Sequence, residues 1–159
     1  MGLFNDLLSF FATRPKQYGT LSVTVREEEV KSHGEQKIAD FLSRNGVRYE
    51  YERLIEAGFW IFTEKVSRPD FYLPDYGVYI EYWGMVDVGD ERDRAKYVRS
   101  MKWKMRQYHE LGVKFISLYP RNLSNLDWIF RKKFKEATGR ELPKVGRSGH
   151  DRDASTSSA

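Results

Sequence analysis

The chain of 159 residues contains no cysteine and only three histidines, His33, His109 and His150. Without thiols there is no disulfide framework and no thiolate metal site, and this absence fits a reducing compartment. We therefore expect a cytoplasmic protein. The few histidines also argue against a zinc site and against an HNH-type nuclease, and we interpret His150 as a solvated residue of the C-terminal tail.

Long hydrophobic runs are also absent. The apolar start of the chain, Met1–Pro15, is too short to cross a bilayer and lacks the basic leader and cleavage site of a secretory signal. Its large apolar residues recur at helical spacing at Phe4, Leu7, Leu8 and Phe11. We expect residues 1–29 to form a small amphipathic helix and a connecting segment. The helix would pack on the domain or on a partner, with a membrane-surface role as the less favoured alternative.

Charge of one sign does not dominate the chain, because the formal net charge is only +4. Basic residues nevertheless outnumber acidic ones in Arg92–Lys114 and in Arg121–Arg147. Such a distribution suits a phosphate backbone, although a solvated helix surface would explain it equally well. The basic residues that we place on outer helix faces and predict to contact nucleic acid are Arg99, Lys102, Arg106, Arg131 and Lys132.

The stretch Arg68–Gly84, RPDFYLPDYGVYIEYWG, predicts two short strands joined by a turn. Apolar and polar residues alternate on both sides of Pro74–Gly77, where proline fixes φ and glycine tolerates positive φ. The cross-strand pairs predicted by this turn are Asp70 with Glu81, Phe71 with Ile80, and Tyr72 with Tyr79.

Directly opposed residues have Cβ atoms roughly 5 Å apart, so two carboxylates in these positions repel each other. A divalent cation would remove this cost, because Mg²⁺ is commonly held by one or two carboxylates together with substrate phosphate and water. The alternative is that Asp70 and Glu81 only line the solvated face of a hairpin, since sheets often have one polar face.

Helices and further strands are predicted around this hairpin. Ser32 begins a helix that Gly46 ends, and Glu35 has the spacing of a capping box with Ser32, so a purely structural task for Glu35 stays open. Further strands are predicted at Val47–Ile55 and Val113–Tyr119, together with a helix at Glu91–Leu111 and a last helix capped by Asn122 or Ser124 and ending before Gly139. Phe59–Thr63 is either the hairpin partner of Val47–Ile55 or an extended connection, and the connecting segment before Ser32 would contain a short strand at Leu21–Val25. The order α-β-β-β-α-β-α indicates an α/β fold with a central mixed sheet of about four to five strands, flanked by helices.

The helix at Glu91–Leu111 directs one lysine inward. At about 100° per residue, Lys104 falls inside an apolar stripe, whereas Lys102 points away from it. The stripe consists of Tyr97, Met101, Met105, Tyr108 and Leu111. A buried ammonium requires a partner, and the carboxylates of the sheet are available. Snorkelling of Lys104 to the edge of the helix face is the alternative.

Three of these stretches resemble the PD-(D/E)XK nuclease superfamily, which has a restriction-endonuclease-like fold. They are GEQKIADFL with Glu35, the hairpin with Pro69, Asp70 and Glu81, and the helix that follows, all within Lys31–Phe134. One position departs from the pattern. The family places a lysine two residues after the second acidic residue, where this chain has Trp83. Lys104 is the substitute that helical geometry favours, and Lys102 is the second choice.

The resemblance implies a Mg²⁺- or Mn²⁺-dependent endonuclease that hydrolyses DNA phosphodiester bonds. Asp70, Glu81 and the backbone carbonyl of Tyr82 would bind the metal, and Glu35 would bind it through water or complete a second site. Lys104 would orient the attacking water or stabilise the transition state. DNA is the implied partner, and a homodimer or a larger nucleic-acid-processing complex stays open. The nuclease domain would comprise residues 30–139, followed by a disordered polar tail at 140–159.

Two other functions stay open at this point. The missing motif lysine is compatible with a catalytically inactive nucleic-acid-binding module on the same fold. The second is an interaction or structural protein that docks a partner through exposed aromatic side chains and the N-terminal helix. Such a protein would show no metal affinity and no salt-dependent DNA binding.

Overall fold

A computed structural model describes residues 21–53, 55 and 68–143. The predicted N-terminal helix, the predicted extended segment at Phe59–Thr63 and the tail from residue 144 onward lie outside the described residues. The elements, in chain order, are β1 (Ser22–Val23), β2 (Glu29–Val30), α2 (His33–Arg44), β3 (Glu50–Tyr51), β4 (Phe71–Leu73), β5 (Val78–Tyr82), α3 (Glu91–Glu110), β6 (Phe115–Leu118), a short 3-10 helix η1 (Pro120–Asn125) and α4 (Leu126–Thr138). From α2 onward this is the predicted order, α-β-β-β-α-β-α.

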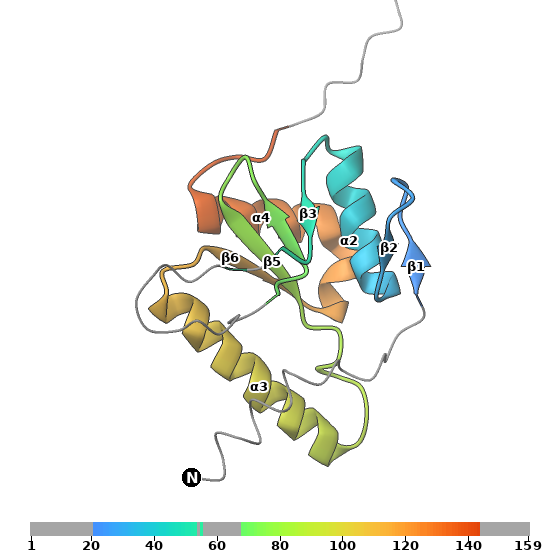
Figure 1. The fold of residues 1–159 in the computed structure, drawn as a ribbon, viewed down its shortest axis with the longest axis vertical. Helices are drawn as coiled ribbons and strands as arrows, with labels where there is room; N and C mark the ends of the chain where they lie inside the picture. The colour runs from blue at the N-terminus through green and yellow to red at the C-terminus, as the bar shows by residue number, and fades with distance from the viewer. Residues whose placement is uncertain (1–20, 54, 56–67, 144–159) are drawn as a thin grey trace, which may run out of the picture.

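The described strands form a mixed four-stranded sheet with the order β3-β4-β5-β6 (Figure 1). Neighbours β3/β4 and β4/β5 are antiparallel, and β5/β6 are parallel. A separate two-stranded sheet joins β1 to β2 beside α2. The α/β class and the mixed sheet are therefore confirmed.

The hairpin of β4 and β5 has the predicted register. Phe71 pairs with Ile80 and Tyr72 pairs with Tyr79. Gly77 has a φ of 63°, the left-handed conformation that the turn requires and that glycine adopts without strain. One residue beyond the paired segment, Asp70 accepts a hydrogen bond from the backbone N–H of Tyr82 at 2.6 Å. The turn chemistry thus fixes which side chains of the two strands share a face.

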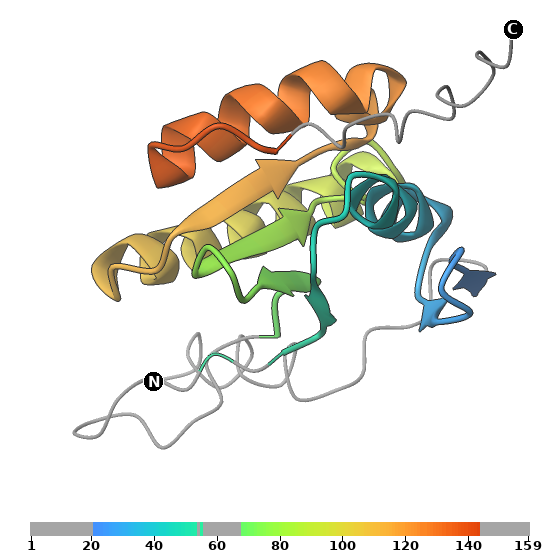
Figure 2. The same cartoon turned by 90° about the horizontal axis from the view of Figure 1, so that it is seen from above.

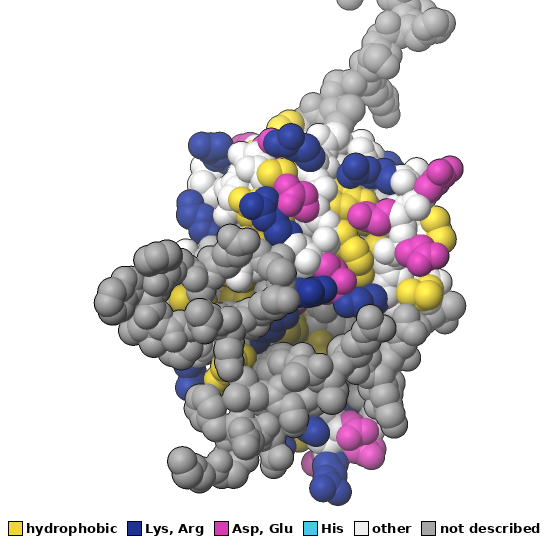
Figure 3. Space-filling view, in the orientation of Figure 1, with side chains coloured by type: hydrophobic (Ala, Val, Ile, Leu, Met, Phe, Trp, Pro, Cys, Tyr) yellow, Lys and Arg dark blue, Asp and Glu magenta, His cyan; other side chains and the backbone are white. Residues whose placement is uncertain are grey.

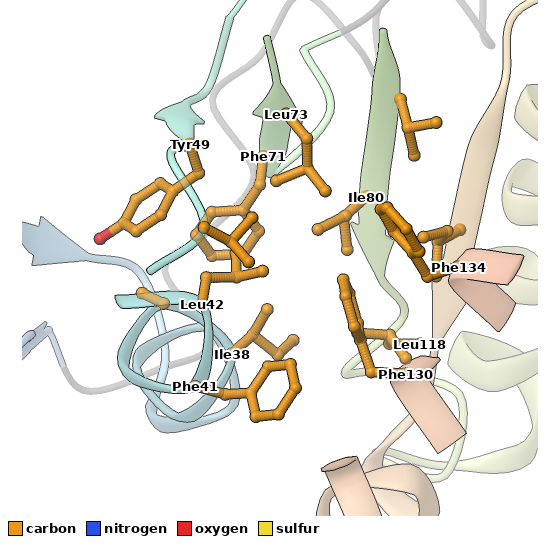
Figure 4. Packing of buried hydrophobic residues seen from close by; sticks show 14 of the residues in the cluster. Ile38, Phe41, Leu42, Tyr49, Phe71, Leu73, Ile80, Leu118, Phe130 and Phe134 are labelled. Carbon is orange, nitrogen blue, oxygen red and sulfur yellow. The ribbon is translucent and has the colours of Figure 1, made fainter. Parts of the chain in front are cut away.

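The two faces of the sheet have different coverings. Alternate residues of the strands point toward α2 and α4 and build the core (Figure 4). The fully buried members of this core include Ile38, Leu42, Phe71, Leu73, Ile80, Leu118, Phe130 and Phe134. On the opposite face, Tyr108 of α3 packs edge-on against Phe115 of β6, with ring centroids 5.0 Å apart. Figure 2 shows the same layers from above. The acidic residues of the hairpin alternate with the core residues and therefore lie on the α3 face.

Two predicted boundaries are wrong. The strand predicted at Val47–Ile55 shrinks to Glu50–Tyr51, because Glu52 has a φ of 51° and leaves the extended conformation. The last helix begins at Leu126, with Asn125 as an N-cap that makes no side-chain hydrogen bond. Asn122 accepts instead from the backbone N–H of Tyr119 at 3.0 Å and caps η1, which intervenes between the strand and α4.

Helix α3 has nearly the predicted length, but its stripe is only partly buried. Asp90 caps it by accepting from the N–H of Asp93 at 2.9 Å, and Gly112 follows its end with a φ of 65°. Tyr108 is fully buried, whereas Leu111 is the C-cap residue and is 43% exposed, so its place in the stripe is wrong. No helix in the described part of the chain is long and apolar enough to cross a bilayer.

Candidate functional site

Asp70 lies at the start of β4, half-buried beneath the end of β5. Its Oδ2 is held by the Tyr82 N–H, and no hydrogen-bond donor among the described residues contacts Oδ1. Burial raises the pKa of the Asp70 carboxyl well above its usual value, and the nearby carboxylates of Glu81 and Glu35 raise it further. The Lys104 ammonium and the Tyr82 N–H act in the opposite direction. The ionised form of Asp70 is therefore disfavoured by its burial and by the neighbouring carboxylates.

Glu81 is the most deeply buried acid of the hairpin, with an exposed fraction of 3%. Its Oε1 accepts a hydrogen bond from the Tyr108 hydroxyl and forms an ion pair with the Lys104 ammonium. Both donors come from α3, one turn apart, on the same face of the helix. No hydrogen-bond donor of the described residues contacts the second oxygen, Oε2. Both donors thus hold Glu81 through the same carboxylate oxygen, Oε1.

Lys104 lies inward, as its helical position predicts. Its side chain is 15% exposed, and its ammonium lies 5.6 Å from the centroid of the Trp83 ring and 5.8 Å from that of Tyr108. The Trp83 indole in turn donates to the Ser117 hydroxyl at 3.0 Å. Two aromatic faces and one carboxylate therefore hold the ammonium, whereas Lys102 is exposed. Trp83, two residues after Glu81, thus helps to position Lys104 of α3.

Glu35 forms the capping interaction with Ser32 that the sequence spacing predicts. It is 7% exposed, and its N–H donates to the Ser32 hydroxyl at 3.2 Å. Its carboxylate accepts from the Ser32 hydroxyl at 2.9 Å, from the Lys31 N–H at 3.1 Å and from the Tyr51 hydroxyl at 2.5 Å. Burial, followed by the hydrogen bond to Glu35, raises the pKa of Tyr51, so Tyr51 stays a donor. Glu35 caps α2, while its charge still acts on Asp70.

Tyr82 contacts both Asp70 and the first turn of α2, which carries Glu35. Its backbone holds Asp70, and its ring lies against Gly34 of α2, where an added Cβ would stand 2.3 Å from ring carbons. Burial raises the pKa of Tyr82, and the charges of Glu35 and Asp70 raise it further. A glycine at position 34 is therefore required for α2 to approach the end of β5 this closely.

The charge balance of this cluster leaves it acidic. Asp70, Glu81 and Glu35 supply three carboxylates, and Lys104 supplies one ammonium. Oδ1 of Asp70 and Oε2 of Glu81 suit a hard divalent cation, which proteins commonly hold with two carboxylates and water. Within residues 21–53, 55 and 68–143, however, no three acidic or histidine side chains come close enough to hold one ion together. The donor set therefore fits a cation bound by Asp70 and Glu81, with Glu35 outside its direct ligands.

The predicted nucleic-acid contacts divide into two groups. Arg99, Lys102 and Arg106 are exposed on α3, and Lys132 is exposed on α4, 5.6 Å above the Trp128 ring. Arg131 does not point outward as expected. Its guanidinium donates to Asp127 of α4 at 3.0 Å, to the Leu142 carbonyl at 3.1 Å and to the Asn45 side chain at 2.8 Å. These partners tie α4 to the end of α2.

Basic and acidic side chains are intermingled on the face of the molecule that Figure 3 shows. Arg99, Lys102 and Arg106 recur at intervals of three and four residues, so they lie along one side of α3.

Sequence reasoning missed the partners that orient the acids. We expected Tyr108 only as a member of the apolar stripe and Tyr51 only as part of the strand at Val47–Ile55, yet their hydroxyls bind Glu81 and Glu35. For Tyr108 a signal existed: it follows the inward Lys104 by four residues and therefore shares its face. For Tyr51 there was none, because its partner lies 16 residues earlier in another element.

Comparison with known proteins adds no family to this geometry. Neither protein-family models, nor curated proteins, nor solved structures give a match to this chain. The functional assignment therefore depends on the site itself and on the resemblance carried by its motifs.

Proposed function

We propose that this protein is a metal-dependent endonuclease that hydrolyses DNA phosphodiester bonds on a restriction-endonuclease-like core. The observation that carries the proposal is the pairing of Glu81 with Lys104, beside Asp70. The sequence motif lacks a lysine after Glu81, and the following helix supplies one to the same carboxylate. Such a buried constellation of opposed charges is common at catalytic centres.

Asp70 and Glu81 would hold the cation through the oxygens that have no donor among the described residues. A bound Mg²⁺ or Mn²⁺ would lower the pKa of a water ligand and offset charge that develops on the phosphate. The carbonyl of Tyr82 lies next in the chain and is the third candidate ligand.

Lys104 supplies a positive charge beside the carboxylates of Glu81 and Asp70. Held by Glu81 and by two aromatic faces, its ammonium is fixed before substrate arrives. A fixed cation stabilises developing negative charge without having to reorganise, so it contributes more to the transition state than to substrate binding. The exposed basic residues of α3 lie on the outer side of the helix, away from Lys104, and would contact the DNA backbone there.

The direct test is cleavage of supercoiled plasmid and of branched DNA by the purified protein with Mn²⁺, compared with EDTA. We expect nicking or linearisation that Asp70→Ala abolishes. The matched control is Asp75→Ala, which changes an exposed acid at the hairpin turn and should leave cleavage intact. Undiminished cleavage by Asp70→Ala would show that the activity does not depend on this site and would refute the proposal.

A catalytically inactive nucleic-acid-binding module on the same fold is the second candidate. It is favoured by one observation, namely that Glu35 is fully engaged in capping α2 and does not complete a three-ligand cluster. This candidate predicts salt-dependent DNA binding without Mn²⁺-dependent cleavage.

A further inference from the structure

We infer that Tyr108 is a positioning residue, which fixes the rotamer of Glu81 so that Oε2 of its carboxylate is presented to a divalent cation. This inference rests on the proposed function. It adds a residue that the motif resemblance does not contain. The observation behind it is that two donors from α3, the Tyr108 hydroxyl and the Lys104 ammonium, meet on the same oxygen of Glu81.

Tyr108 is held in place by its surroundings. It is fully buried, and its ring packs edge-on against Phe115, itself in contact with His109 at a centroid distance of 5.3 Å. A buried tyrosine hydroxyl requires a hydrogen-bond partner. Glu81 supplies that partner from the neighbouring strand, so the hydroxyl is a rigid reference point for the carboxylate.

Lys104 alone would not decide which oxygen of Glu81 is bound. Its ammonium is held near two aromatic rings, but a compact charge attracts either oxygen of a carboxylate, so Glu81 could turn either oxygen toward it. A phenol donor is directional and comes from a side chain with few rotamers. The combination therefore selects Oε1 as the oxygen that the protein binds and leaves Oε2 for the cation.

Loss of the Tyr108 hydroxyl should weaken the affinity of the site for the cation. Residues that orient metal ligands typically change metal affinity or activity by about 10- to 100-fold when they are removed. Tyr108→Phe keeps the ring and its packing and deletes only the donor. Glu81 then retains Lys104 but gains rotational freedom, which the cation must restrict on binding.

The test compares the full chain with Tyr108→Phe and with Tyr76→Phe. Tyr76 is the matched control, because its ring packs edge-on against Phe134 at 4.8 Å, at the turn of the hairpin far along β5 from Glu81. Isothermal titration with MnCl₂ in the absence of DNA should give a dissociation constant about 10-fold or more higher for Tyr108→Phe. Tyr76→Phe should equal the wild type.

A second readout separates positioning from a general structural role. The Mn²⁺ concentration for half-maximal cleavage should rise by the same factor, while turnover at saturating Mn²⁺ stays within about threefold of the wild type. The melting temperature in EDTA should fall by no more than about 5 °C, the scale of one lost hydrogen bond. Mn²⁺ affinity within twofold of the wild type would overturn the inference.

Failure of this inference and failure of the proposed function can be told apart. If the wild type binds Mn²⁺ and cuts DNA but Tyr108→Phe behaves identically, only the role of Tyr108 falls. If the wild type neither binds Mn²⁺ nor cuts DNA, both fall together. Should phenylalanine unfold the protein, 3-fluorotyrosine at position 108 retains the donor. Its ¹⁹F resonance should be broadened by Mn²⁺, and an unchanged resonance would refute the inference.

Discussion

Asp70 is the residue at which stability and the proposed function conflict. Burial and the charges of Glu81 and Glu35 raise the pKa of its carboxyl above the ordinary value of 3.8. In the pH range between these two values the folded protein binds more protons than the unfolded chain, so the free energy of unfolding falls as pH rises. The cluster is therefore a cost to the folded protein at neutral pH in the absence of a cation.

Asp70→Asn should for this reason stabilise the metal-free protein at pH 7. We expect the melting temperature in EDTA to rise by about 3–6 °C, the shift that about 1 kcal/mol produces in a domain of this size. The difference between variant and wild type should shrink toward pH 4, where Asp70 is protonated in the folded protein. A lower melting temperature for Asp70→Asn at pH 7 would contradict the account of the charge cluster.

Mn²⁺ should make the wild type more stable than Asp70→Asn, the reverse of the order expected in EDTA. A ligand that binds only the folded protein stabilises it by RT ln(1 + [L]/Kd), which is about 2.7 kcal/mol at a hundredfold excess over Kd. Millimolar Mn²⁺ should therefore raise the melting temperature of the wild type and leave that of Asp70→Asn unchanged. Equal shifts in both proteins would place the cation elsewhere.

Lys104 and Lys102 of α3 provide a second residue-scale prediction. Lys104→Met should abolish turnover while DNA affinity stays within about twofold, because its ammonium lies inside the site and not on the surface. Lys102→Met should weaken DNA binding and lower the slope of log affinity against log salt by about one, since it removes one exposed cation. Turnover and filter-binding measurements on both variants decide the matter. Loss of turnover in Lys102→Met alone would show that the assignment is reversed.

At the scale of the elements, α2 approaches the end of β5 only because position 34 has no side chain. Gly34→Ala would place a Cβ 2.3 Å from the Tyr82 ring, and overpacking of this kind typically costs about 1–3 kcal/mol. We expect urea denaturation to show this loss for Gly34→Ala and no comparable loss for Lys37→Ala, an exposed position of the same helix. Tyr82→Leu in the Gly34→Ala background should recover part of the stability, and the absence of any coupling would refute the contact.

Helix α4 offers a contrast between two neighbouring basic residues. Arg131→Ala should lower the free energy of unfolding by about 1–3 kcal/mol, because it removes hydrogen bonds to Asn45 and Leu142 and leaves their partly buried acceptors unpaired. Its DNA affinity should not change. Lys132→Ala should leave stability within about 0.5 kcal/mol and weaken DNA binding in low salt. The opposite pattern would mean that Arg131 is a DNA contact after all.

For the molecule as a whole, local pattern predicted the order of the elements well and the site only in part. The turn at Pro74–Gly77 fixed the register of β4 and β5, and helical spacing placed Lys104 inward and Lys102 outward. These features depend on neighbours within a few residues. The binding of Arg131 to Asn45 and of Tyr51 to Glu35 depends on contacts across the fold, which one sequence does not encode locally.

Strand and helix ends were the least predictable features. Glu52 ends β3 with a positive φ, which a sequence without glycine at that position does not predict. The short helix η1 separates β6 from α4, where we expected only a capping residue. Leu111 belongs to the apolar stripe by spacing, but the helix ends before the stripe can be covered there. Such ends are decided by tertiary packing rather than by the residues at the boundary.

The fold brings Asp70, next to β4, together with Glu81 of β5 and Lys104 of α3. Our central proposal is that Asp70 and Glu81 hold a divalent cation. The most direct measurement is anomalous diffraction at the manganese edge from crystals soaked in MnCl₂. We predict one strong peak bonded to the carboxylates of both Asp70 and Glu81, with the Lys104 ammonium still paired to Glu81. Well-diffracting crystals with no peak at these carboxylates, or with manganese bound only at surface acids, would contradict the account.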